Sequence, residues 1–207
     1  MDSFDQDALS AAVNSGADDI LSLLVDAGRR ARGGRSRYRR AMVAAAASGR
    51  ANPLRLLLAA GADPERGDDK SGESPLHFAA AGGQTEIVTL LIQAGARPDV
   101  PDHRGFPPLI EAARNGHGDV VRALLEHGAR SGLQDALAAA AVAGMSGPLP
   151  PATVEDARGV VRLLLAAGAD PHAKTTDGRT VMDAIESMSP QSGRSEMLAM
   201  LRKGTRR

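Results

Sequence analysis

The sequence predicts an all-α fold: a solenoid of helix-turn-helix repeat units joined by β-hairpin or turn fingers. Three observations support this prediction. A set of small and apolar residues recurs at intervals of 33 or 34 residues. The chain is 43% hydrophobic but has only three Phe, one Tyr and no Trp, so alanine and aliphatic side chains must form the core. Glycines and prolines bound each apolar segment, as expected for short helices.

Aligning the sequence with itself locates the repeat. Nine positions of the third unit recur 33 residues later in the fourth: residues 75, 76, 79, 80, 83, 88, 91, 95 and 96 match residues 108, 109, 112, 113, 116, 121, 124, 128 and 129. The separation from the second unit to the third is 34 residues, and from the first to the second it is 33. A period of this length indicates stacked repeats that bury their apolar faces against neighbours.

The third unit shows the expected elements most clearly. Ser74 is a suitable N-cap, and Pro75 suits the first helical position because its missing N–H costs nothing there. This first helix is predicted to end at Gly82 and Gly83. A second helix follows in "TEIVTLLIQAG", with an apolar stripe and a closing Gly95. The next residues, "ARPDVPDHRG", predict a turn-rich finger.

The other units are less regular. The first resembles a capping unit without a finger, and the sixth keeps a finger, "TTDGRT", as a closing unit. In the fifth unit the finger is five residues shorter, and about twelve residues are inserted between its helices. We place this insert at residues 146–156 and interpret it as a tolerated loop rather than a second contact site. A single domain, residues 1–207, is therefore expected, with units at about 5–30, 31–64, 65–98, 99–130, 131–171 and 172–204.

The segment "DKSGESPLHFAAAGGQTEIVTLLIQAGARPD" resembles an ankyrin repeat, and so does "DHRGFPPLIEAARNGHGDVVRALLEHGAR". The resemblance covers nearly the whole chain, in about six units, with the third and fourth complete. It implies a non-catalytic protein-protein interaction module. In the fourth unit Pro107 replaces the Thr or Ser of the family pattern and Ile110 replaces its His. The hydrogen bonds of that pair are therefore not expected there.

The resemblance also implies where a partner protein binds: at the finger tips, at the end of each first helix and on the concave helix face. The predicted partner-binding residues are Lys70, Ser71, Glu73, Ala81, Gly82, His103, Arg104, Phe106, Arg114 and Asn115. Phe106 has two open interpretations. It is either an exposed aromatic contact or a cover over Pro107 and Pro108.

The segment "RRARGGRSRYRR", residues 29–40, holds seven arginines, whereas residues 1–28 hold six aspartates and no basic residue. One interpretation is an anion or nucleic-acid binder, with Arg35, Arg37, Tyr38, Arg39 and Arg40 as its contacts. The interpretation we favour is a solvated loop that complements the acidic N-terminal unit. The 25 basic and 25 acidic residues balance over the whole chain, which disfavours nucleic-acid or membrane binding.

Catalytic and metal-binding patterns are absent from the sequence. It has no cysteine, no glycine-rich phosphate loop and no metalloprotease motif, and its five histidines are scattered. We therefore expect no enzyme activity, no cofactor and no metal, although an active site in the insert stays a minor alternative. The N-terminus lacks a signal peptide and no segment could span a membrane, so we expect a cytoplasmic monomer. The partner could be a scaffolded protein, an inhibited toxin or enzyme, or a target in another cell.

Overall fold

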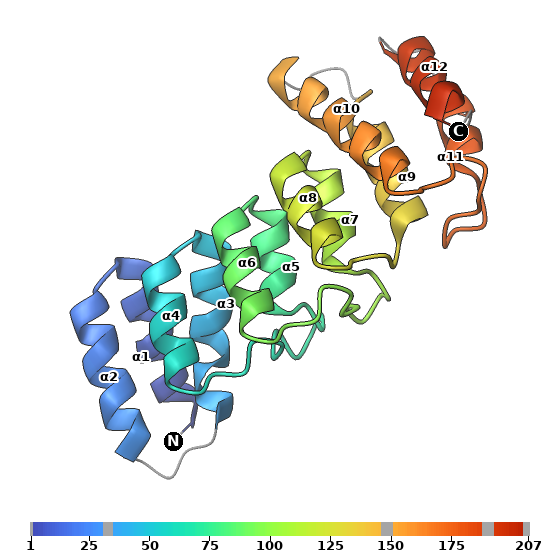
Figure 1. The fold of residues 1–207 in the computed structure, drawn as a ribbon. Helices are drawn as coiled ribbons and strands as arrows, with labels where there is room; N and C mark the ends of the chain where they lie inside the picture. Colours follow the sequence, from blue (N-terminus) through green and yellow to red (C-terminus); the bar gives the residue numbers. More distant parts are fainter. Residues whose placement is uncertain (1, 31–34, 146–150, 188–192, 205–207) are drawn as a thin grey trace. The chain divides into compact units, whose positions relative to one another are not determined.

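The structure, a computed structural model, describes residues 2–30, 35–145, 151–187 and 193–204. These residues form helices joined by turns, with one isolated antiparallel bridge between Lys174 and Thr180 (Figure 1). The predicted all-α fold is confirmed. The chain divides into two compact halves, Met1–Pro108 and Leu109–Arg207, which are described separately.

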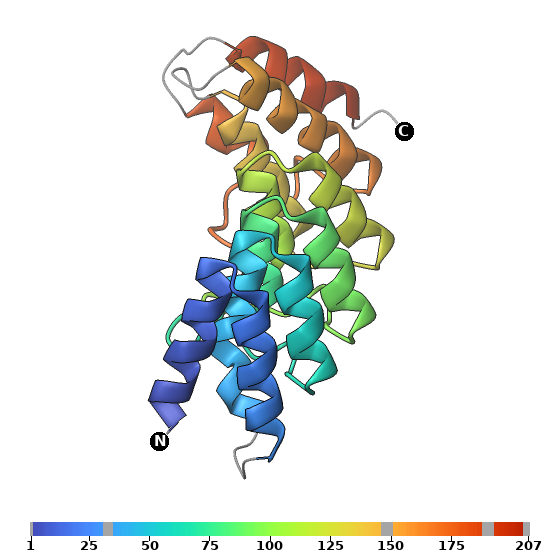
Figure 2. The same cartoon turned by 90° about the vertical axis from the view of Figure 1, so that its left-hand side faces the viewer.

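The N-terminal half consists of helix pairs arranged in two layers (Figure 2). The first helix of each pair packs on the first helix of the next, as α1 does on α3 and α3 on α5. The second helices form the other layer, in the order α2, α4 and α6. The bounds are α1 Asp2–Ser15, α2 Asp18–Arg30, the 3-10 helix η1 Arg35–Tyr38, α3 Arg39–Ser48, α4 Ala51–Ala59, α5 Pro75–Ala81 and α6 Thr85–Gln93.

Alanine pairs allow the first helices to approach one another closely. Ala45 and Ala46 of α3 have no exposed surface, and neither have Ala79 and Ala80 of α5. In the second layer, leucines such as Leu57 and Leu91 fill the space between helices and are also fully buried. The core thus uses small residues in one layer and branched aliphatic residues in the other. This explains how the chain folds with few aromatic residues.

Glycines with positive φ end the first helix of each of the first four repeat units. Gly16, Gly49, Gly83 and Gly116 have φ values of 77°, 70°, 70° and 75°, a left-handed conformation that glycine adopts without a steric penalty. Their recurrence in the sequence therefore marks recurring turns. Gly95, predicted to close the second helix of the third unit, has φ of 100°.

The C-terminal half repeats the helix pairs with different lengths. Its helices are α7 Pro108–Arg114, α8 Gly118–Glu126, α9 Leu133–Ala143, α10 Pro151–Ala166, α11 Val181–Glu186 and α12 Arg194–Gly204. Within this half α9 packs on α11, and α10 packs on α8, α9 and α12. The start of α11 has a capping box, because Thr180 N–H donates to Asp183 Oδ2 at 3.2 Å and Asp183 N–H donates to Thr180 Oγ1 at 3.0 Å.

The insert is not a loop throughout. Residues 146–150 lie outside the described residues, but residues 151–156 form the first turns of α10, with Pro151 at the first helical position. The buried stripe of α10 begins early, since Ala157 is 1% exposed and Val160 is fully buried. Our interpretation of residues 151–156 as a loop was therefore wrong. Proline is well tolerated at the start of a helix, so Pro151 starts α10 rather than interrupting it.

The finger that precedes α5 is one residue longer than the finger that precedes α7. In finger 4 (residues 97–107), Asp102 N–H donates to the Phe106 carbonyl four residues on, at 2.9 Å. In finger 3 (residues 63–74), Asp68 N–H donates to the Glu73 carbonyl five residues on, at 2.8 Å. The additional residue accounts for the 34-residue step in the sequence.

Candidate functional site

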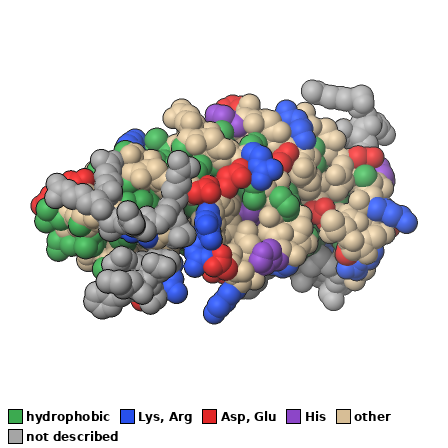
Figure 3. Space-filling model, turned by 90° about the horizontal axis from the view of Figure 1, so that it is seen from below, with side chains coloured by type: hydrophobic (Ala, Val, Ile, Leu, Met, Phe, Trp, Pro, Cys, Tyr) green, Lys and Arg blue, Asp and Glu red, His purple; other side chains and the backbone are tan. Residues whose placement is uncertain are grey.

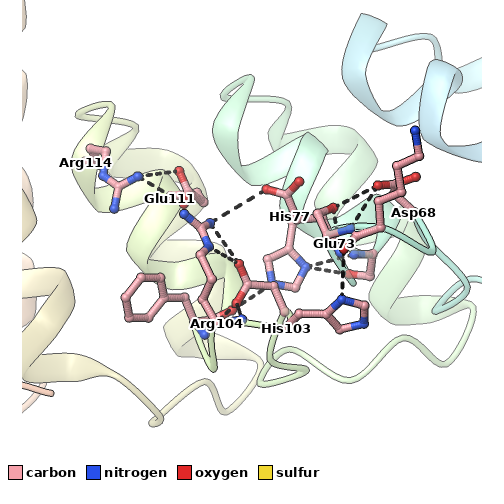
Figure 4. A network of polar contacts seen from close by, with 12 residues as sticks. Asp68, Glu73, His77, His103, Arg104, Glu111 and Arg114 are labelled. Carbon is pink, nitrogen blue, oxygen red and sulfur yellow. Dashed lines mark hydrogen bonds and ion pairs between the residues drawn. The ribbon is translucent and has the colours of Figure 1, made fainter.

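Fingers 3 and 4 are joined to each other by hydrogen bonds in the N-terminal half. His103 N–H donates to the Ser71 carbonyl at 2.9 Å, and His103 Nδ1 lies 3.0 Å from the Lys70 carbonyl oxygen. Because a carbonyl only accepts, Nδ1 must carry the proton of this second bond. Lys70, Ser71 and His103, all predicted partner contacts, therefore lie together on two connected tips (Figure 4).

His77 connects the start of α5 to finger 4. Ser74 N–H donates to His77 Nδ1 at 3.0 Å, so this nitrogen is unprotonated. The other ring nitrogen, Nε2, then carries the hydrogen and donates to the Phe106 carbonyl at 2.9 Å. His77 is 1% exposed and forms these bonds as a neutral side chain. Its role is structural, as its place in the repeat indicates.

Asp102 organises the tip of finger 4. Its side chain is 1% exposed; Oδ1 accepts the N–H groups of Arg104 and Phe106 at 2.9 Å each, and Oδ2 accepts Arg104 Nε at 2.8 Å. Burial acts to raise the pKa of Asp102, but these hydrogen bonds and the Arg104 charge outweigh it and lower the pKa below the ordinary value. The carboxylate therefore stays ionised and fixes the backbone of the tip.

Phe106 is partly covered by its own finger. The Arg104 guanidinium carbon lies 5.2 Å from the centroid of the Phe106 ring, and Arg104 is also 4.0 Å from Glu73. Phe106 is half-buried, while Pro107 and Pro108 are buried. Arg104, Glu73 and Phe106 thus form one connected surface on fingers 3 and 4 (Figure 4).

The other predicted partner contacts lie at the ends of first helices. In the N-terminal half, Gly82 after α5 is exposed and Ala81 is half-buried. In the C-terminal half, Arg114 and Asn115 at the end of α7 are exposed, and Arg114 Nη1 lies 3.2 Å from Glu111 Oε1. At the position where the family pattern has histidine, Ile110 is 3% exposed and contributes apolar packing instead of hydrogen bonds.

A hollow of about 310 Å³ lies between α3, α5 and finger 3. We call it the α3–finger pocket; residues 39, 40 and 43 of α3, residues 67–70 of the finger and Phe78 of α5 line it. Val43 and Phe78 are half-buried and present apolar surface, whereas Lys70 is exposed. Our sequence prediction did not include Val43 or Phe78. The available signal was the place of Phe78 in the phrase Pro-Leu-His-Phe-Ala-Ala, where it is the one residue without a framework role.

The arginine run does not form one anion-binding surface in the described part of the chain. Arg37 and Tyr38 are 8% and 4% exposed, and Arg37 Nη1 donates to the Gly28 carbonyl at 2.8 Å, near the C-terminal end of α2. The predicted availability of these two side chains was therefore wrong, because packing against α2 buries them. The side chain of Arg35 lies outside the described residues.

Arg39 and Arg40 lie on α3 and form ion pairs with Asp69 and Asp7, respectively. The Arg40 pair connects the run to the acidic N-terminal unit, as the favoured interpretation requires. Both arginines also line the α3–finger pocket.

Figure 3 shows the molecule from below, the side on which the finger loops lie in Figure 1, with acidic and basic side chains interspersed on this face. In the C-terminal half, a second hollow of about 510 Å³ lies between α8 and α10 and is lined partly by Gly116, Gly118 and Gly159. Among the described residues, no three His, Asp or Glu side chains are grouped as a metal site would require. No helix in the described ranges is long and apolar enough to cross a membrane.

Residues 41–135 match the family model for ankyrin repeats, in three copies. The chain is an ankyrin repeat protein. The matched residues include α3 to α8 and both connected fingers, so the family assignment and the helix pairs agree. No curated protein matches the chain significantly. Ankyrin repeats are in general protein-protein interaction modules, and repeats of this kind typically have no enzyme activity.

Proposed function

We propose that this ankyrin repeat protein is a non-catalytic binding module that holds one partner protein on fingers 3 and 4 and on the neighbouring first helices. The observation that carries this proposal is the hydrogen-bonded connection between the two fingers. It presents Lys70, Ser71, His103 and Arg104 on one preorganised surface, and a preorganised surface loses little conformational entropy on binding.

The chemistry of this surface also favours binding over catalysis. The carboxylate of Asp102 and the imidazole of His77 are committed to backbone groups, so neither is available as an acid or base toward a substrate. The exposed groups are a lysine, arginines, a histidine and a half-buried phenylalanine. Such groups provide ion pairs and aromatic contacts with a protein surface.

The alternative function is binding of an anion or nucleic acid through residues 29–40. Arg39 and Arg40 favour it because they are cationic and near a pocket. The burial of Arg37 and Tyr38 disfavours it, because single-stranded nucleic acid needs an exposed aromatic platform for stacking. Nucleic-acid binding would appear as a steep loss of affinity with rising salt.

A quantitative affinity pull-down from native lysate tests the proposal. The finger variant carries Lys70→Ala, Glu73→Ala, Arg104→Ala and Phe106→Ala. The control variant carries Arg55→Ala and Glu86→Ala, which removes an exposed ion pair of 2.7 Å from the second-helix layer. A protein retained by the wild type and the control, but lost by a finger variant with unchanged circular dichroism, supports the proposal. Retention of the same proteins by all three chains contradicts it.

A further inference from the structure

We infer that the α3–finger pocket binds an acidic segment of the partner that inserts a large aliphatic side chain between two glutamates or aspartates. This inference rests on the proposed protein-binding function and names the chemistry of the partner. It follows from an apolar floor, a cationic rim and the position of the arginine run.

The floor of the pocket is apolar and open. Val43 projects from α3 and Phe78 from α5, and both are half-buried although their repeat units are otherwise well packed. A half-buried aromatic side chain on a first helix has apolar surface that no other part of the N-terminal half covers. Within the hollow of about 310 Å³, this surface can accept one leucine- or isoleucine-sized side chain.

The rim is cationic at its outer edge. Arg40 and Lys70 are exposed, and Lys70 forms no ion pair in the part of the chain that the structure describes. Arg39 lies deeper, with 17% of its side chain exposed, and pairs with Asp69. A partner carboxylate can contact Lys70 directly and can compete with Asp69 for Arg39, because Asp69 is the more exposed member of that pair at 66%.

The two acidic residues of the pocket do not cancel this charge. Asp68 is occupied within the finger, where Oδ2 accepts Ser71 N–H at 3.0 Å and Ser71 Oγ–H at 3.2 Å. Asp69 is neutralised by Arg39. An approaching anion therefore meets Lys70 and Arg40 without an unpaired carboxylate nearby on the finger, which favours acidic partners in encounter and in orientation.

The arginine run explains why this pocket, rather than another part of the fingers, is selective for acid. Arg39 and Arg40 are the last two of its seven arginines, so the run leads directly to the rim along the chain. The two interpretations of the sequence, a finger surface and an anion-binding run, thus meet at one pocket. The predicted ligand is a protein segment because the apolar floor has no use in binding phosphate groups alone.

The test is an NMR titration of the ¹⁵N-labelled full chain with the peptide probe acetyl-Asp-Glu-Leu-Glu-Asp-amide. Two matched probes replace its acids by Asn and Gln or its leucine by glycine. We expect amide shifts confined to residues around the pocket, with Val43, Lys70 and Phe78 among them. Each replacement in the probe should weaken binding about tenfold or more, which corresponds to loss of about 1.4 kcal/mol.

Two pocket variants and one control complete the test. Arg40→Glu with Lys70→Glu reverses the rim charge, and Val43→Phe fills the pocket from its open side while retaining an apolar residue. Both should weaken the acidic probe about tenfold or more. The control Arg66→Glu reverses an exposed charge of finger 3 that does not line the pocket, and it should change the affinity less than about twofold.

Several results would overturn the inference. These are equal binding of the neutral probe, shifts that map elsewhere, and displacement of the shifts by a thymidine oligonucleotide while the acidic peptide fails to bind. The last result would favour the nucleic-acid alternative. A protein captured in the pull-down, lost in the finger variant but retained by Val43→Phe and by Arg40→Glu, would leave the proposed function intact and contradict only the pocket.

Discussion

Replacing Asp102 with alanine should destabilise finger 4 strongly. The substitution removes the acceptor of two backbone N–H groups, those of Arg104 and Phe106, each bonded at 2.9 Å to a side chain that is 1% exposed. Hydrogen bonds to a charged acceptor contribute about 1.5 kcal/mol or more each, so the two together contribute about 3 kcal/mol. The ion pair with Arg104 adds less than about 1 kcal/mol, since the Arg104 side chain is 54% exposed.

Urea unfolding followed by far-UV circular dichroism measures this loss, and amide hydrogen exchange shows where it occurs. Asp69→Ala is the matched control, because Asp69 is 66% exposed and its pair with Arg39 should contribute less than about 1 kcal/mol. In Asp102→Ala the amides of Arg104 and Phe106 should exchange faster, while those in the middle of α4 stay protected. Equal stability losses in the two variants would refute the role given to Asp102.

Three further predictions concern the same fingers. His77→Ala leaves Ser74 N–H and the Phe106 carbonyl unpaired in a buried place, so it should cost about 2 kcal/mol or more in urea unfolding; a loss below about 0.5 kcal/mol would contradict the assignment. Gly67→Ala should be more damaging than Gly105→Ala, because a Cβ at position 67 would lie 1.7 Å from the Glu73 carbonyl oxygen whereas position 105 is open; thermal unfolding gives the order. Since the folded pKa of Asp102 lies below its unfolded value, its contribution is present above the unfolded pKa and is lost as pH falls through the folded pKa. Melting temperatures between about pH 5 and pH 2 should therefore fall less steeply for Asp102→Asn than for the wild type.

The repeat period predicted the helix pairs well, because glycine and proline leave strong local signals. Gly83 and Gly116 both have the left-handed conformation that their recurrence indicates. Pro75 and Pro108 both stand at the first position of a helix, as expected. Signals of this kind need no knowledge of distant contacts, so one sequence is sufficient to find them.

Features that depend on packing were not predictable from the sequence. Arg37 and Tyr38 belong to a strongly polar run, yet tertiary contacts with α2 bury them. The α3–finger pocket combines residues of α3, finger 3 and α5 that are distant in sequence, and Phe78 has no unusual neighbour in the chain. Pro151 was read as part of a loop because proline suggests a break, but its place at the start of α10 depends on the buried stripe that follows.

Site-specific photo-crosslinking in the native cell tests the central claim most directly. A photoreactive phenylalanine is placed at position 70 or 103 on the fingers, or at position 55 on α4 as the control. The account predicts that one and the same protein is crosslinked from positions 70 and 103 but not from position 55. Crosslinks to that protein from position 55 alone, or to nucleic acid in place of protein from the fingers, would contradict it.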